Sequence, residues 1–291
     1  MTRQDFKFFH SLRVRWAEVD MQKIVFNAHY LMYFDTAIAD YWRALALPYS
    51  QAMELLGGDL YVKKASVEYH GSARFDDRLD VALRLGHIGN SSMVFNGAIF
   101  RSDELLITGE LVYVFADPAT QKSKPVPDAL RSVLTGFEAG QPSYAIKTGS
   151  WAELGADAAL VREEVFVHEQ KIPIEMEWDS ADANALHAVA YNGLGQAIGT
   201  ARLLEPSVLS ASAGTVKIGR MAVKSALRGG GVGRDLLREL MVCAKRRGHQ
   251  KVVLHSQRSA QRFYERAGFT AQGQPFDEVG IPHIEMVALL P

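Results

Sequence analysis

The sequence has little of what several large classes of protein need. It contains one cysteine, Cys243, among 291 residues, which excludes a disulfide framework and a cysteine-based metal cluster and fits a reducing compartment. Its 32 Lys and Arg nearly balance 33 Asp and Glu, so no overall field favours nucleic acid. No apolar run approaches the length of a membrane span, and the charged start MTRQDFKFFHSLRVRW lacks an apolar signal core. We therefore expect a cytoplasmic protein with no metal, nucleic-acid or membrane partner.

The first half of the chain has the periodicities of a strand and one long helix, followed by more strands. Apolar residues alternate in FHSLRVRW and then recur at helical spacing through residues 27–48, where Pro48 ends the pattern. Four alternating segments follow, namely LYVKKASVEY, LDVALRLGH, SSMVFNGAIF and ELLITGELVYVFAD. This order predicts an α+β fold, in which the long helix packs against an antiparallel sheet.

A stretch rich in proline and glycine separates the two halves. Three prolines fall within residues 117–130, and GFEAGQPSY, residues 136–144, has no periodicity. We place the domain boundary there and predict domains of residues 1–137 and 138–291. The second half predicts an α/β domain with a mixed sheet. We expect helices in 151–169, directly after the glycine loop, and at 259–267. We expect strands at 186–192, 197–204, 215–223, 251–255 and 284–289, and a loop rich in Ser and Ala before residue 215.

The segment ALRGGGVGRDLL, residues 226–237, is typical of a phosphate-binding loop. Four glycines lie between Arg228 and Arg234, and glycines let successive N–H groups point at one ligand beside a helix start. The dinucleotide fingerprint fails, because Arg234 or Leu236 stands at the sixth position. The P-loop fails as well, because Asp235 follows Gly233-Arg234 where Lys and Ser or Thr are needed. A flexible turn on a basic surface is the other interpretation.

With these features the second half resembles the GNAT acyltransferases, in the ElaA-like branch, whose loop of the type Arg-x-x-Gly-x-Gly/Ala holds the pyrophosphate of acetyl-CoA. The alternation of Val216 and Ile218 slips before Met221, as the bulge in the family's preceding strand requires. AQRFYERAGF, residues 260–269, resembles the family's Ala-x-x-Phe/Leu-Tyr-x-x-x-Gly-Phe. Gln257 stands where the family often has Asn, seven residues before the tyrosine.

The resemblance implies roles for these residues. Tyr264 would be the general acid that protonates the departing CoA thiolate, although a core aromatic packed beside Phe263 is the alternative. The implied acyl-CoA contacts are Met221, Ala222 and Val223 in the strand, Arg228, Gly229, Gly230, Gly231, Val232, Gly233 and Arg234 in the loop, and Gln257. Acyl transfer also requires a base that neutralises the acceptor amine. His255, His283, Glu169 and Glu285 are all candidates, and the sequence does not choose among them.

The first half contains a second candidate site at Asp20. This residue follows a predicted strand and precedes a short loop and the long helix, where free helix N–H groups could bind an oxyanion. Asp20 could activate water against a thioester, or it could only cap a turn. The segment RVRWAEVDMQKIVFNAHYLMYFDTA, with VEYHGSARFDDRLDV and GNSSMVFNGAIF, resembles the hotdog acyl-CoA thioesterases of the 4-hydroxybenzoyl-CoA thioesterase type. Asn27 replaces the histidine that many members have.

The second resemblance completes the expected function. It implies that Asp20 is the nucleophile or general base, that backbone N–H groups of His29, Tyr30 and Leu31 bind the oxyanion, and that the chain forms a homodimer or homotetramer through the hotdog domain. Together the halves predict a bifunctional acyl-CoA protein that hydrolyses a thioester and transfers an acyl group, expected to be acetyl, to a small-molecule or peptide amine. The alternative is a thioesterase whose GNAT domain binds acyl-CoA without catalysis and regulates the hydrolase.

Overall fold

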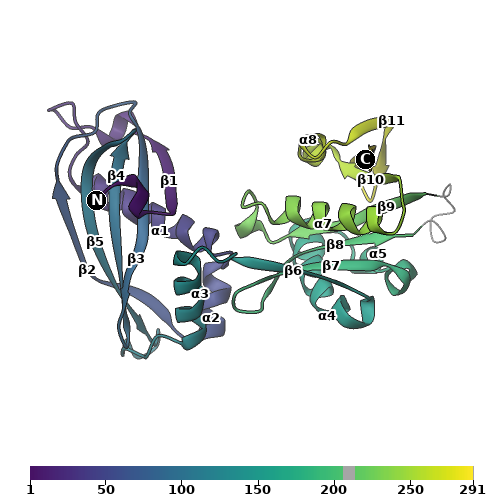
Figure 1. The fold of residues 1–291 in the computed structure, drawn as a ribbon, viewed down its shortest axis with the longest axis horizontal. Helices are drawn as coiled ribbons and strands as arrows, with labels where there is room; N and C mark the ends of the chain where they lie inside the picture. Colours follow the sequence, from purple (N-terminus) through teal and green to yellow (C-terminus); the bar gives the residue numbers. More distant parts are fainter. Residues whose placement is uncertain (206–213, 291) are drawn as a thin grey trace. The chain divides into compact units, whose positions relative to one another are not determined.

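The computed structural model describes residues 1–205 and 214–290, which belong to two compact units, Met1–Ser143 and Tyr144–Pro291 (Figure 1). The units divide after Ser143, within residues 136–144, the stretch in which we place the boundary. The limit written as residue 137 lies one residue before the end of helix α3, Asp128–Glu138. The predicted Ser/Ala-rich loop before residue 215 lies almost wholly outside the described residues.

The first unit is the predicted helix on an antiparallel sheet (Figure 1). The sheet has the order β1-β3-β4-β5-β2, with every neighbouring pair antiparallel. Its strands are β1 Phe8–Arg13, β2 Asp59–Tyr69, β3 Arg78–Ile88, β4 Ser92–Arg101 and β5 Glu104–Ala116. The helices are α1 Ala28–Ala44, α2 Tyr49–Leu56 and α3, with short turns η1 Arg3–Asp5 and η2 Trp16–Glu18. The α+β prediction for this half is confirmed.

Helix α1 packs on the sheet through the ring of Phe34. This side chain is fully buried and stands over Gly97 and Gly109, which pair with each other across β4 and β5. A methyl group at Gly97 would lie 2.3 Å from Cε1 of Phe34, and one at Gly109 would lie 2.7 Å from Cε2. Only glycine therefore leaves room for the ring at these positions, because interiors are close-packed. The pair of glycines sets how closely α1, and the loop that enters it, approach the sheet.

The second unit is the predicted mixed sheet between helices. The sheet has the order β11-β12-β10-β9-β8-β7-β6, and β9 and β10 form its parallel pair. Its strands are β6 Tyr144–Gly149, β7 Leu186–Asn192, β8 Ala197–Leu204, β9 Thr215–Val223, β10 Lys251–Gln257, β11 Thr270–Glu278 and β12 Ile281–Leu289. The helices are α4 Trp151–Arg162, α5 Ile174–Glu177, α7 Val232–Arg246 and α8 Gln261–Arg266, with the π-helical η3 Glu163–Glu169 and the short turns η4 Ser180–Asn184, η5 Ser225–Leu227 and η6 Arg258–Ala260.

Helices α4 and α7 lie on opposite faces of this sheet (Figure 1). Val189 packs against Leu154 and Ala158 of α4, whereas a side chain at Gly199, which pairs with Ala190, would meet Val232 and Leu236 of α7. Successive strand residues point to opposite faces. Following the pairing across the sheet places Arg202, Lys217 and His255 on the α4 face.

Strand β9 has the bulge that the sequence predicts. Thr200 pairs with Ala222 and Arg202 pairs with Gly219, so Arg220 and Met221 of β9 stand opposite the single residue Ala201. Arg220 has a φ of 49°, the left-handed conformation that a non-glycine residue adopts only under constraint. The slip in alternation between Ile218 and Met221 is therefore confirmed as a β-bulge.

Some elements were missed for identifiable reasons. Strand β11 is exposed along most of its length and therefore shows no hydrophobic alternation. Helix α2 begins directly after Pro48, so the proline that ends one helix also precedes another. Strand β6 and helix α3 fall within or beside the stretch that the sequence indicates as a linker.

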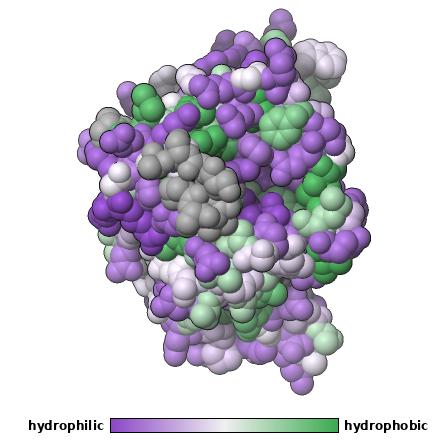
Figure 2. Space-filling view, turned by 90° about the vertical axis from the view of Figure 1, so that its right-hand side faces the viewer, coloured by the Kyte–Doolittle hydropathy of each residue, from purple (hydrophilic) through white to green (hydrophobic). Residues whose placement is uncertain are grey.

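Outside the core, hydrophilic residues predominate on the face shown in Figure 2, and hydrophobic residues there form separate small patches. This distribution is ordinary for a protein surface. No helix in the described parts of the chain is both long and apolar enough to cross a membrane.

Candidate active sites

The bulged end of β9 frames the site of the second unit. Strand β10 pairs with β9 only along residues 215–217, while Ala222 and Val223 remain paired with β8 on the other side. Beyond Lys217, the edge of β9 that faces away from β8 therefore has no strand partner among the described residues. Its polar backbone groups can bond a ligand instead. This edge includes Met221, Ala222 and Val223, the three positions predicted to contact acyl-CoA.

The glycine loop follows this edge and ends at the start of α7. Gly229 and Gly231 have φ values of 85° and 96°, a conformation that glycine adopts without strain. The first turn closes when the N–H of Asp235 donates to the carbonyl of Gly231 at 3.0 Å. The preceding N–H groups, of Val232, Gly233 and Arg234, meet no backbone acceptor in residues 1–205 and 214–290. A helix start with open N–H groups is suited to bind phosphate.

The two arginines of the loop are engaged differently. Arg228 donates to both carboxylate oxygens of Glu169 at 2.6 Å, and its Nε donates to the carbonyl of Val223 at 3.0 Å. Hydrogen bonding from Arg228 lowers the pKa of Glu169, so this candidate base is held as a carboxylate. Arg234 is largely exposed and pairs with Asp235 at 3.0 Å. Arg228 thus joins the loop to η3, and Arg234 is the arginine left open to solvent.

Two cavities meet at the β9 edge. The loop cavity, of about 560 Å³, lies against the glycine loop from Arg228 to Arg234 and against Phe263. The sheet cavity, of about 430 Å³, extends over the α4 face toward Lys217 and His255. The residues that line both are Met221, Ala222, Val223, Arg228 and Tyr264. A long ligand in the loop cavity can therefore present one end to a second ligand in the sheet cavity.

Tyr264 stands where the two cavities join. It comes from α8, and its hydroxyl donates to Sδ of Met221 at 3.6 Å. The rings of Phe263 and Phe269 lie against it at 4.9 and 6.0 Å between centroids. Burial raises the pKa of Tyr264 to about 12, so the phenol keeps its proton at neutral pH. The structure shows both an aromatic contact and a proton donor on the cavity wall.

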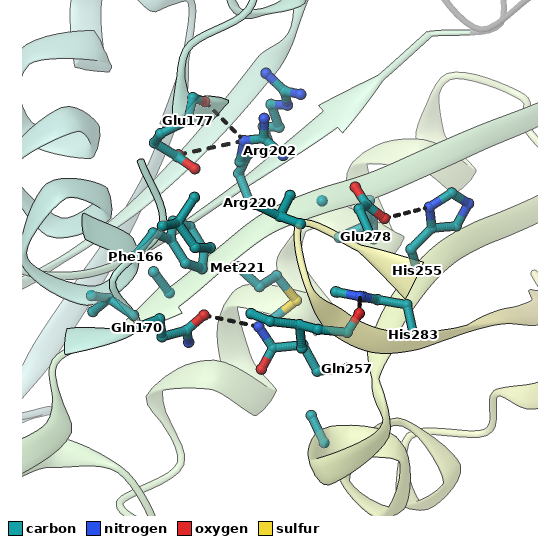
Figure 3. Close-up of a pocket in the computed structure, with 18 of the residues that line it drawn as sticks. Phe166, Gln170, Glu177, Arg202, Arg220, Met221, His255, Gln257, Glu278 and His283 are labelled. Atoms are coloured by element: carbon teal, nitrogen blue, oxygen red, sulfur yellow. Dashed lines mark hydrogen bonds and ion pairs between the residues drawn. The ribbon is translucent and has the colours of Figure 1, made fainter. Parts of the chain in front are cut away.

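The sheet cavity contains the other polar candidates (Figure 3). Gln257 donates from Nε2 to Oε1 of Gln170 at 2.9 Å, which joins β10 to the segment after η3. Nδ1 of His255 lies 3.1 Å from Oε2 of Glu278, and Nδ1 of His283 lies 2.7 Å from the carbonyl of Ile281. Figure 3 shows the rings of His255 and His283 on neighbouring strands beside Glu278.

A buried ionic network under the sheet cavity was missed by sequence reasoning. Arg202, which is 5% exposed, donates to Asp179 and Asp182 at 2.6–2.7 Å. Arg220, the residue of the bulge, donates to Asp179 at 3.1 Å and to the carbonyl of Glu177 at 3.2 Å. These partners come from segments far apart in sequence, so no spacing in the sequence indicates them. The network fixes the bulge and hence the β9 edge.

Asp20 lies in a tight turn before α1 in the first unit. Its Oδ1 accepts from the N–H of Gln22 at 2.8 Å, and its own N–H donates to the carbonyl of Ile24 at 2.9 Å. The carboxylate therefore caps the turn, as one interpretation of the sequence predicts. This bond occupies one oxygen and leaves Oδ2 without a hydrogen-bond partner among the described residues. The turn thus fixes the position of a half-exposed carboxylate and leaves one of its oxygens able to react.

The predicted oxyanion donors lie at the start of α1. The N–H of His29 donates to the carbonyl of Phe26 at 2.9 Å, and the N–H of Tyr30 donates to that of Asn27 at 3.4 Å. The Tyr30 hydroxyl accepts from the N–H of Ala73 at 3.0 Å, which joins the helix start to the loop between β2 and β3. Leu31 is partly exposed beside them. Two of these three N–H groups already donate to carbonyls of the turn. That they bind an oxyanion stays a prediction.

Glu18 anchors the Asp20 turn and was also missed. Its buried carboxylate accepts from the guanidinium and N–H of Arg15 at 2.6–2.8 Å and from the Tyr33 hydroxyl at 2.8 Å. Burial alone would raise the pKa of Glu18, but the hydrogen bonds from Arg15 and Tyr33 outweigh it and lower the pKa. The carbonyl of Glu18 accepts from the N–H of Phe26 at 2.9 Å. The spacing of three between Arg15 and Glu18 was the only available signal.

Family models match both halves of the chain. Residues 14–134 match a family described as the thioesterase-like superfamily, and residues 152–290 match the acetyltransferase (GNAT) domain. The matched ranges contain Asp20 in the first case and the glycine loop with Tyr264 in the second.

Individual relatives show the same division. The "Uncharacterized N-acetyltransferase YjcF" of Bacillus subtilis is 33% identical over 132 residues, which are 45% of this chain and 89% of the relative. A protein of Aquifex aeolicus that bears the name esterase is 30% identical over 96 residues, 33% of this chain and 74% of the relative. The acyl-CoA thioester hydrolase YbgC of Escherichia coli O157:H7 is 26% identical over 120 residues, 41% of this chain and 89% of the relative.

The glycine loop offers a test of acyl-CoA binding. In Gly231→Ala an alanine must adopt the φ of 96°, and its methyl group lies 3.1 Å from the Arg234 guanidinium, so the backbone at the start of α7 is strained. We expect the Kd for acetyl-CoA, measured by calorimetry, to rise roughly tenfold, since left-handed backbone costs an alanine about 1–2 kcal/mol. Gly195→Ala, at a φ of 77° in a turn with open space around it, is the matched control. Equal Kd values for the two variants would contradict this assignment.

Proposed function

Because the chain belongs to the thioesterase-like superfamily over residues 14–134 and to the GNAT acetyltransferases over residues 152–290, we propose that it is a bifunctional acyl-CoA enzyme. The first unit hydrolyses an acyl-CoA thioester. The second transfers an acyl group, expected to be acetyl, from CoA to a small-molecule or peptide amine. The observation that carries the proposal is the pair of cavities that meet at Tyr264 and the β9 edge.

In the first unit, the proposed hydrolysis uses the free oxygen of Asp20. The turn bond from Gln22 holds Oδ1, so Oδ2 either attacks the thioester carbonyl or takes a proton from an attacking water. The developing oxyanion lies at the start of α1, where N–H groups and the positive end of the helix dipole stabilise it. Glu18 keeps the turn in place without contacting the substrate.

In the second unit, the proposed transfer starts with acyl-CoA in the loop cavity. The open N–H groups at Val232, Gly233 and Arg234 bind its pyrophosphate, and the β9 edge orients the thioester. A neutral amine in the sheet cavity attacks the carbonyl, so that a C–N bond forms and the C–S bond breaks. Tyr264 donates its proton to the departing thiolate, and the proton that the attacking nitrogen loses restores the phenol. Because the acid must carry its proton, this contribution is present below the Tyr264 pKa of about 12 and is lost as pH rises through it.

The surface beside Asp20 supports a further proposal, that a second copy of the chain covers the first site. Met21 is fully exposed, and Trp16 and Phe26 are 77% and 49% exposed, so large apolar side chains flank the carboxylate. Strand β2 is an edge of its sheet and exposes Val62. A homodimer or homotetramer buries these groups and pairs the free edge.

Light scattering tests this assembly. We expect a mass of two or four times the 32.2 kDa of the chain. Met21→Glu together with Val62→Lys places charges on the proposed contact, so the assembly should dissociate and hydrolysis should fall, while acetyl-CoA binding by the second unit persists. A monomeric wild-type chain with full hydrolytic activity would refute it.

Two substitutions separate the proposed activities. Asp20→Asn should lower amine-independent thiol release from acyl-CoA about 100-fold or more and leave amine-dependent release unchanged, since it removes the base or nucleophile. Tyr264→Phe should do the reverse, with roughly a 100-fold loss of amine-dependent release. Free thiol is followed with and without a panel of amines and acyl-CoAs.

The chain provides matched controls for both. Asp117 caps a turn through the same type of bond, from the N–H of Ala119, so Asp117→Asn should leave hydrolysis unchanged. The Tyr191 hydroxyl bonds Asp157 away from both cavities, so Tyr191→Phe should leave transfer unchanged. Full hydrolysis by Asp20→Asn would overturn the first assignment. Acetyl-CoA binding without turnover of any amine would instead favour a second unit that only binds and regulates.

A further inference from the structure

Three side chains in the sheet cavity form a chain of contacts that the proposed transfer leaves unused. Glu278 of β11 lies 3.1 Å from Nδ1 of His255 on β10. Nζ of Lys217 on β9 lies 3.1 and 3.3 Å from Nδ1 and Nε2 of the same ring. All three line the sheet cavity, which also includes Tyr264 and Met221. An amine that meets a base, with that base oriented by a carboxylate, is the arrangement of a proton relay.

The other candidate bases are occupied or less well placed. Glu169 is held by two hydrogen bonds from Arg228, and their effect lowers its pKa, which weakens it as a proton acceptor. The Nδ1–H of His283 donates to the carbonyl of Ile281, and its ring stacks on Phe276. The group that orients His283 is therefore a neutral carbonyl and not a carboxylate. Glu285 pairs opposite His255 in the ladder but does not line the sheet cavity as the relay residues do. His255 is the candidate that a carboxylate orients.

The charges around His255 suit a group that gains and loses a proton. Lys217 faces it from β9, Glu278 from β11, and Glu285 and His283 from β12. Arg202 and Arg220 lie further along the α4 face, where Asp179, Asp182 and Glu177 neutralise them. Burial lowers the pKa of Lys217. Burial alone would raise the pKa of Glu278, but the hydrogen bond and charge of His255 outweigh it and lower the pKa.

We propose that Lys217, His255 and Glu278 form the proton-accepting relay of the acyltransferase site, an inference that rests on the proposed transfer. Glu278 holds the Nδ1–H of His255, which leaves Nε2 as an acceptor. Nζ of Lys217 passes one of its protons to Nε2 and replaces it with a proton from the ammonium group of the acceptor. The acceptor is then a neutral amine, and the imidazolium is balanced by Glu278. The amine attacks the thioester, while Tyr264 supplies the thiolate's proton.

Histidine labelling tests the relay without any acceptor amine. In ¹⁵N spectra of the full chain with labelled histidine, neutral His255 should carry its proton on Nδ1, and Glu278→Gln should abolish that preference. Lys217→Met should change the ¹⁵N chemical shift of Nε2, because it removes the group that contacts this nitrogen at 3.3 Å. His255 protonated on Nε2 in the wild type, or indifferent to both substitutions, would overturn the relay.

Kinetics test its catalytic role. With acetyl-CoA and the panel amine that the wild type acylates fastest, His255→Gln and Lys217→Met should lower kcat/KM about 100-fold at pH 7. The deficit should shrink as pH approaches the amine's own pKa, about 10.4 for a lysine side chain, because the free amine then needs no base. A deficit independent of pH would indicate only structural damage and would contradict the relay.

A second histidine provides the control. Nε2 of His249 lies 2.8 Å from Glu205, a similar pair outside the sheet cavity, so His249→Gln should leave kcat/KM unchanged at every pH. If no amine in the panel supports thiol release by the wild type, the proposed transfer itself fails, and the histidine spectra still decide whether the relay exists.

Discussion

The bulge at Arg220 and Met221 is the constraint on which the second unit depends. One extra residue opposite Ala201 reverses the phase of β9, so that Ala222 faces α4 again after Gly219. The parallel pairing with β10 ends at Lys217, just before the bulge. The β9 edge is thereby free to contact a ligand, and the sheet opens between β9 and β10. Both cavities border this edge, so their common boundary follows from a single irregularity in one strand.

A buried ionic network holds the bulge in its left-handed conformation. Arg220 donates to Asp179 and to the carbonyl of Glu177, while Arg162 and Arg202 satisfy the remaining carboxylates at 2.5–2.8 Å. A buried charge without its partner costs several kcal/mol, so these pairs must form together. The same network places α5 over the α4 face and closes one wall of the sheet cavity. In the first unit, Glu18 has the corresponding role, because it holds the turn that carries Asp20.

Local patterns in the sequence predicted the elements that have strong periodicity. Strands 186–192, 197–204 and 215–223 were predicted with the bounds that the structure has. The first two are short segments that are buried along most of their length, and the third alternates up to its bulge. Strand β11 was missed, since its exposed residues lack that pattern. The glycine loop and Tyr264 could be found from a motif that lies within a short stretch of chain. The relay could not, because Lys217, His255 and Glu278 come from three strands that meet only in the folded sheet.

Each of the two units belongs to a family that uses acyl-CoA. The central claim is therefore that one chain has two separate sites for the same cofactor. The two proposed sites differ in the groups that would bind acyl-CoA: one offers a helix start beside a carboxylate, and the other offers a glycine loop beside a bulged strand. The most direct test is calorimetric titration of the full chain with a thioether analogue of acetyl-CoA, which neither unit can cleave. The account predicts two analogue molecules bound per chain, of which Gly231→Ala weakens one. A stoichiometry of one per chain would contradict it.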